Sequence, residues 1–115
     1  MAIDTTLRRA VRRIAEALTK YARTQGWKDD EYQIYYYVNS TWNKLHVIFV
    51  ARGFEGRGDF QNYVSVREHL EKELADEPGL LDMLGLIVRS PKEVEEGGIY
   101  AIGPEYREYG ILSRP

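Results

Sequence analysis

The chain has two histidines and no cysteines, which limits the chemistry it can perform. Nucleophilic catalysis needs a Ser, Thr, Cys or Lys side chain beside a positioned general base. His46 lies in an apolar segment typical of a strand and His69 in a segment typical of a helix, and neither belongs to a recognisable catalytic motif. Two distant histidines form a metal site only if the fold brings carboxylates beside them. We therefore predict a non-enzymatic protein with no catalytic residues, no metal and no cofactor.

A glycine-rich connector follows the apolar segment 45–51 and reads Gly53-Phe54-Glu55-Gly56-Arg57-Gly58. It lacks the Gly-Lys-Ser/Thr ending of a P-loop and the Gly-x-Gly-x-x-Gly spacing, so it does not predict a phosphate site. Aromatic and arginine side chains often dominate protein interfaces. The connector and the start of the next helix are therefore predicted to form a partner-binding patch of Phe54, Arg57, Phe60, Asn62 and Tyr63. The alternative is that Phe54 and Phe60 fold back as plugs over the sheet edge.

Basic residues are concentrated at the start of the chain, although the net charge is −2. Residues 1–28 hold seven Lys and Arg against two acidic residues, whereas the rest holds nine against sixteen. Four of the arginines pair at i and i+4 in the first predicted helix: Arg8, Arg9, Arg12 and Arg13. They are candidates for binding phosphates or an acidic partner, and the alternative is that they dock against the chain's own acidic residues. Because the acidic remainder opposes phosphate, we expect any nucleic-acid binding to be weak.

Hydrophobic periodicity predicts a first helix and a hairpin. Apolar residues at spacings of three and four indicate a helix over about residues 5–25, which Gly26 is suited to end. Aromatic and β-branched residues then indicate strands over 32–38 and 45–51.

Alternation along these two strands predicts a core face and an outer face of the sheet. The core face carries Leu45, Val47, Phe49 and Ala51 in the second strand. The outer face is predicted to carry a second possible interface, which would either stack on bases or close a homodimer: Tyr35, Tyr37 and His46.

The elements after the connector complete an α+β fold. A second helix is predicted to begin with Asp59 or Asn62 as its N-cap, or at a capping box from Ser65 to Glu68. The remaining expected elements are a helical turn over 80–84, a strand over 86–89, a short helical turn after Ser90, and short strands over 99–102 and 106–112. Residues 1–115 thus form one domain in the order helix, strand, strand, helix, short helix, strand. Its sheet is small and mixed or antiparallel, with the two main helices on one face.

The element order and several short motifs resemble the BolA-like proteins. The motifs are Phe54-Glu55-Gly56-Arg57, Gln61 and the run from Leu86 to Glu93, and the resemblance covers about residues 5–95. It implies a class II KH-like fold and a role in transcriptional regulation or in iron–sulfur handling with monothiol glutaredoxins. The family's cluster-binding histidine is replaced here by Asn62 or Tyr63, depending on register. The fold is therefore expected to carry over, and cluster ligation is not.

These observations together predict a small interaction or regulatory domain. The chain has no apolar run long enough to cross a bilayer, and its lack of cysteine fits a reducing compartment. We expect a cytoplasmic protein that binds a protein partner and not a membrane. One alternative is a secretion-chaperone-like dimer that uses the Tyr35, Tyr37 and His46 face, and a second is a nucleic-acid-binding module that uses the arginine-rich first helix.

Overall fold

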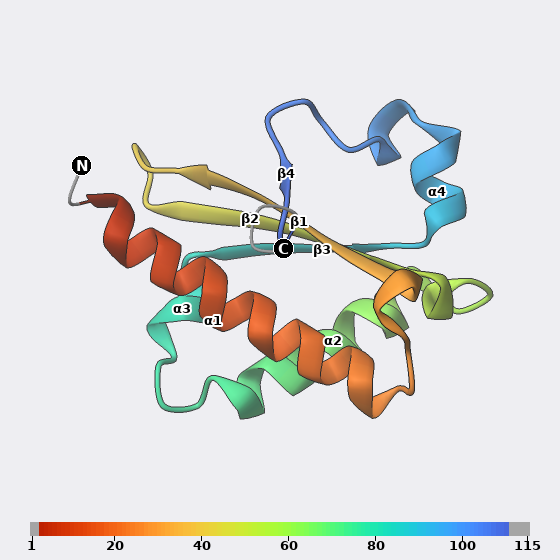
Figure 1. The fold of residues 1–115 in the computed structure, drawn as a ribbon, viewed down its shortest axis with the longest axis horizontal. Coiled ribbons are helices and arrows are strands. Elements are labelled where there is room, and N and C mark those ends of the chain that lie inside the picture. The colour runs from red at the N-terminus through yellow and green to blue at the C-terminus, as the bar shows by residue number, and fades with distance from the viewer. Residues whose placement is uncertain (1–2, 111–115) are drawn as a thin grey trace.

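The computed structural model describes residues 3–110, with side chains from Leu7 onward, as an α+β fold with one four-stranded sheet (Figure 1). The α-helices are α1 (Ile3–Thr24), α2 (Asp59–Glu73), α3 (Gly79–Asp82) and α4 (Pro91–Glu96). The strands are β1 (Tyr32–Asn39), β2 (Lys44–Ala51), β3 (Leu84–Arg89) and β4 (Arg107–Glu108). Short 3-10 turns occupy Asp29–Glu31, Arg52–Phe54 and Gly98–Tyr100.

The sheet has the strand order β3-β2-β1-β4 and is mixed, one of the two arrangements that the sequence left open. β1 pairs antiparallel with β2 and with β4, whereas β3 runs parallel to β2. The parallel pair requires a long crossover, which α2 and α3 provide. Helices α1, α2 and α3 lie on one face of the sheet, and α4 with the segment leading to β4 lies on the other (Figure 1).

The core lies between the sheet and helices α1 and α2. Register pairs Ile34 with Phe49 and Tyr36 with Val47, so that these side chains share one face. Phe49 has no exposed surface and Val47 is 2% exposed, which confirms the predicted core face.

Helix α1 ends in a Schellman motif, as Gly26 predicted. Gly26 has a φ of +79°, its N–H donates to the Arg23 carbonyl at 3.0 Å, and the Trp27 N–H donates to the Ala22 carbonyl at 2.9 Å. The motif reverses the chain and directs Trp27 back toward the core, where it contacts Phe49. Within residues 3–110, no helix is both long and apolar enough to cross a membrane.

Helix α2 begins at Asp59 with Gly58 as N-cap, one residue before the predicted N-cap Asp59. The predicted capping box at Ser65 is wrong, because Ser65 lies in the middle of α2. Its hydroxyl shares a 2.8 Å hydrogen bond with the Tyr21 hydroxyl of α1. A capping box does form at α4, where Ser90 and Glu93 exchange hydrogen bonds.

The predicted strand over 99–102 is also wrong. Gly97 and Gly98 have φ angles of +75° and +63°, so the chain turns sharply after α4 into a 3-10 turn. Tyr100 then lies under the Arg89 guanidinium, 4.9 Å from ring centre to Cζ. The strand predicted over 106–112 is found as Arg107–Glu108, and its last two residues lie outside the described part of the chain.

Candidate functional site

The connector between β2 and α2 is anchored from below by Phe54. This side chain is only 2% exposed and contacts Trp27 and Phe49 edge-to-face, with ring centres 5.3 and 5.5 Å apart. Gly53 leaves room for the Trp27 ring, since a Cβ at this position would lie 2.3 Å from its Cζ2 atom. The assignment of Phe54 to a surface patch is therefore wrong: it is a core residue that fixes the connector.

Asn62 anchors the connector from the helix side. It is 2% exposed, and its Nδ2 donates to the Phe54 carbonyl at 3.1 Å. Its Oδ1 has no hydrogen-bond partner among the described residues. The assignment of Asn62 to a partner-binding surface is wrong as well, because its short amide is turned inward to satisfy the connector backbone.

Two of the predicted patch residues do lie at the surface. Phe60 is 77% exposed on the first turn of α2, and Arg57, three positions before it and between two glycines, is also exposed. Tyr63 is half-buried against the core. A shallow hollow of about 260 Å³ lies beside Phe60 and Val64. We call Arg57, Phe60 and Val64 the connector surface.

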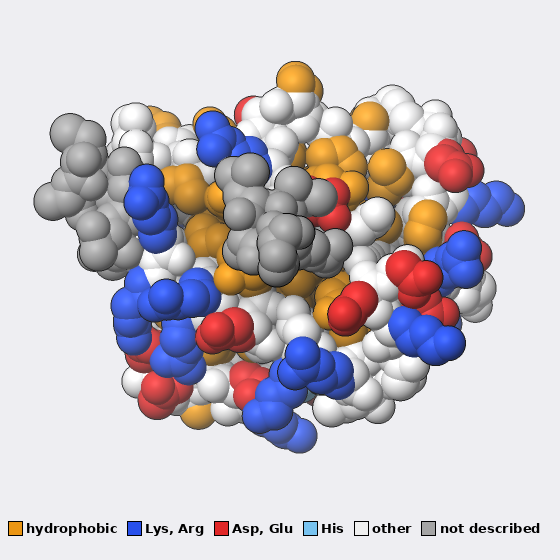
Figure 2. Space-filling model, viewed as in Figure 1, with side chains coloured by type: hydrophobic (Ala, Val, Ile, Leu, Met, Phe, Trp, Pro, Cys, Tyr) orange, Lys and Arg blue, Asp and Glu red, His pale blue; other side chains and the backbone are white. Residues whose placement is uncertain are grey.

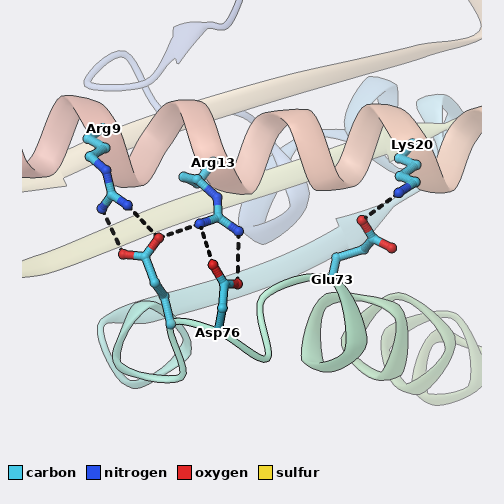
Figure 3. A network of polar contacts seen from close by, with 6 residues as sticks. Arg9, Arg13, Lys20, Glu73 and Asp76 are labelled. Carbon is cyan, nitrogen blue, oxygen red and sulfur yellow. Dashed lines mark hydrogen bonds and ion pairs between the residues drawn. The ribbon is translucent and has the colours of Figure 1, made fainter.

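The four arginines of α1 divide into two pairs with different surroundings. Arg9 donates to Glu77 at 2.7 Å, and Arg13 contacts both Glu77 and Asp76, the latter at 3.1 Å (Figure 3). Lys20 extends this row with a 2.9 Å ion pair to Glu73 (Figure 3).

These ion pairs join the basic helix α1 to the acidic end of α2. The hydrogen bond from Arg9 holds the pKa of Glu77 below its ordinary value, and the one from Arg13 does the same for the pKa of Asp76. Docking against the chain's own acidic residues is thus the role of Arg9 and Arg13. Arg8 and Arg12 are exposed and form no ion pair within the described residues.

The outer face of the sheet is partly covered. Tyr37 stacks on His46 with ring centres 5.6 Å apart, and Tyr106 of the C-terminal segment lies 6.0 Å from Tyr37. Tyr35, Tyr37 and His46 are each half-buried. Sequence periodicity placed them correctly on one face, but it gave no sign that the segment before β4 returns over that face.

Both histidines have packing partners. His46 stacks on Tyr37, and the Nε2–H of His69 donates to the Ala17 carbonyl of α1 at 2.9 Å. No cluster of three or more His, Cys, Asp or Glu side chains that could hold a metal ion occurs among the described residues.

A larger hollow, which the sequence did not predict, lies at the outer edge of β1. This β1-edge cleft has a volume of about 400 Å³ and is lined by residues that include Arg8, Tyr36, Tyr37, Val38, Glu105 and Arg107. Figure 2 shows hydrophobic side chains between groups of Lys and Arg side chains above the first turns of α1. The sequence signal for the cleft was Gly103-Pro104, a turn that precedes the last strand.

Comparison of the chain with protein-family models, with curated proteins and with solved structures found no match.

Proposed function

We propose that this chain is a non-enzymatic interaction domain that binds a protein partner through the connector surface. The observation that carries the proposal is the contrast between two aromatic residues of one connector. Phe54 is 2% exposed, whereas Phe60 is 77% exposed and follows the exposed Arg57 by three residues. Aromatic and arginine side chains are enriched at protein interfaces, so an exposed phenylalanine and an exposed arginine in one short segment favour burial in a complex.

The anchoring of the connector supports this proposal. Phe54 is held by Trp27 and Phe49, and Asn62 bonds the Phe54 carbonyl, so both ends of the connector are tied to the core. A surface that is fixed before binding loses less conformational entropy when the partner arrives. Phe54 and Asn62 are therefore proposed as positioning residues for Arg57 and Phe60.

The resemblance to BolA-like proteins agrees with the proposal at the level of element order. Helix, strand, strand, helix, short helix and strand follow one another from α1 to β3. Asn62 is one of the two residues that replace the family's cluster-binding histidine. It is buried and donates to the Phe54 carbonyl, so we propose partner binding without cluster ligation. A cytoplasmic location is proposed with it, on the basis of the cysteine-free sequence.

The two alternative functions have less support. A secretion-chaperone-like dimer would use Tyr37 and His46, which already stack on each other beneath Tyr106. Nucleic-acid binding would use the α1 arginines, of which Arg9 and Arg13 are paired with carboxylates.

A photo-crosslinking experiment tests the connector surface. Phe60 is replaced with p-benzoylphenylalanine in the full chain, which is irradiated in the cells that express it. The matched control carries the same group at Ile99, which is 87% exposed in the segment after α4. We expect a discrete adduct from position 60 that the additional change Arg57→Glu removes. Equal labelling from positions 60 and 99, or an adduct indifferent to Arg57→Glu, would contradict the proposal.

A further inference from the structure

The β1-edge cleft exists because β4 is shorter than β1. β4 pairs only with Tyr35 and Tyr36, so the outer edge of β1 from Tyr37 to Asn39 has no strand partner among residues 3–110. Before β4 the chain turns, with the Tyr106 N–H donating to the Gly103 carbonyl at 3.1 Å. Pro104 lies within this turn and has no N–H to offer a neighbouring strand. The last third of β1 is thus left open along one edge.

The open edge presents backbone groups of Val38 to the cleft. The Ile34 carbonyl accepts a 2.7 Å hydrogen bond from Tyr109 N–H, so the backbone of Ile34 faces the β4 side. The N–H and C=O groups of successive residues alternate in direction along a strand, so the backbone groups of Tyr36 and Val38 point to the β4 side as those of Ile34 do. Tyr36 is paired with Arg107, whereas Val38 lies beyond the last pair and lines the cleft. Its N–H and C=O are therefore placed to receive a further strand.

The charges at this edge favour an acidic occupant. Arg107 is paired with Tyr36 and shares the helix-side face of the sheet with it, and Arg8 reaches the same cleft from α1. Both arginines are exposed, and neither forms an ion pair within the described residues. The Glu105 carboxylate is folded back over its own turn, since a Cβ on Gly103 would meet its Oε1 at 2.5 Å.

We propose that the β1-edge cleft binds an extended acidic segment of a partner protein, which adds to β1 as a short strand and places one carboxylate beside Arg8 and Arg107. The residue opposite Val38 exchanges backbone hydrogen bonds with it and points its side chain to the helix side, where the two arginines lie. Its neighbours point to the other side, toward Tyr37, which suits apolar side chains. A volume of about 400 Å³ accommodates a few residues of peptide. A nucleic acid lacks the backbone donors and acceptors that match a strand edge.

This surface is separate from the connector surface, and an NMR titration tests it directly. The ¹⁵N-labelled chain is titrated with the peptide acetyl-Thr-Val-Glu-Val-Thr-amide. Two matched peptides carry Lys or N-methyl-Glu at the centre, the first reversing the charge and the second removing the backbone donor. We expect the amide signals of Tyr37, Val38 and Asn39 to shift with the Glu peptide. Both control peptides should bind at least about tenfold more weakly, because the Lys peptide loses a charge-assisted hydrogen bond and the N-methyl peptide leaves a backbone acceptor of the strand edge unpaired.

Charge variants of the chain complete the test. Arg8→Glu and Arg107→Glu should each weaken binding of the Glu peptide by about tenfold or more. The matched variant Arg23→Glu, at the exposed far end of α1, should leave the affinity unchanged. The proposal is overturned if the Glu peptide produces no shifts at millimolar concentration or if the control peptides bind equally well. It is also overturned if free glutamate, phosphate or oligothymidylate displaces the peptide at equal concentration, since the cleft would then be a small-anion or nucleic-acid site.

Discussion

Two phenylalanines in the same connector should respond in opposite ways to truncation. Phe54→Ala removes a ring that is 2% exposed, and burial of such a side chain contributes about 1.5–3 kcal/mol. It also removes two edge-to-face pairs, with Trp27 and Phe49, each worth about 0.5–1.5 kcal/mol beyond burial. These contributions bracket the roughly 3–5 kcal/mol that a Phe→Ala change costs in a protein core. We expect a loss of stability in that range.

Phe60→Ala is the matched control, because it makes the same chemical change six residues later in the sequence. Phe60 is 77% exposed, so its truncation should change the free energy of unfolding by no more than about 0.5 kcal/mol. Urea unfolding of both variants, followed by tryptophan fluorescence and by circular dichroism, measures the two values. Phe54→Ala should lower the denaturant midpoint strongly without changing the dependence of the unfolding free energy on urea concentration. The unfolding curve of Phe60→Ala should superimpose on that of the parent chain.

The outcome decides between an anchor and a surface contact for each ring. If Phe54→Ala left the midpoint within error of the parent chain, the aromatic cluster beneath the connector would not hold it, and the positioning role would fail. If Phe60→Ala cost several kcal/mol, Phe60 would be a core plug and the connector surface would lose its main residue.

Three further predictions rest on the packing and the charges. Gly53→Ala should destabilise the fold by about 1–3 kcal/mol in the same urea assay, because the new methyl group meets the packed Trp27 ring; an unchanged midpoint would show that this ring moves freely. Arg13→Ala should lower the melting temperature at pH 7 but not in acid. The pKa of Asp76 is held below its ordinary 3.8, so the stabilisation from the Arg13–Asp76 ion pair is lost as pH falls through that lowered pKa. A melting-temperature difference that persists at pH 2 would contradict the ion pair. Burial raises the pKa of Tyr35 above 10.0, so the stability that its neutral form contributes is complete below pH 10 and is lost as pH rises through the higher folded value. Titration at 295 nm should show the same number of tyrosines ionising near pH 10 in the parent chain and in the variant Tyr35→Phe; one more in the parent chain would refute the prediction.

Local signals in the sequence predicted the elements well. The Schellman ending at Gly26, the proline-led helix after Ser90 and the alternation along β2 depend on neighbours within a few residues. Such signals persist in the fold because the same backbone and side-chain groups satisfy one another locally. They fail where a distant partner takes over, as at Ser65, whose hydroxyl bonds Tyr21 of another helix.

The functional surfaces were decided by tertiary structure. Phe54 and Phe60 have the same side chain in the same glycine-rich segment, and the contacts of Phe54 with Trp27 and Phe49 decide which one is buried. Arg9 and Arg8 are adjacent, yet the approach of Glu77 neutralises the first and leaves the second at the β1-edge cleft. The sequence by itself determined which segments form helices and strands, because periodicity and caps are local. Which side chains remain free to bind was decided by contacts between residues far apart in the chain, which local patterns do not encode.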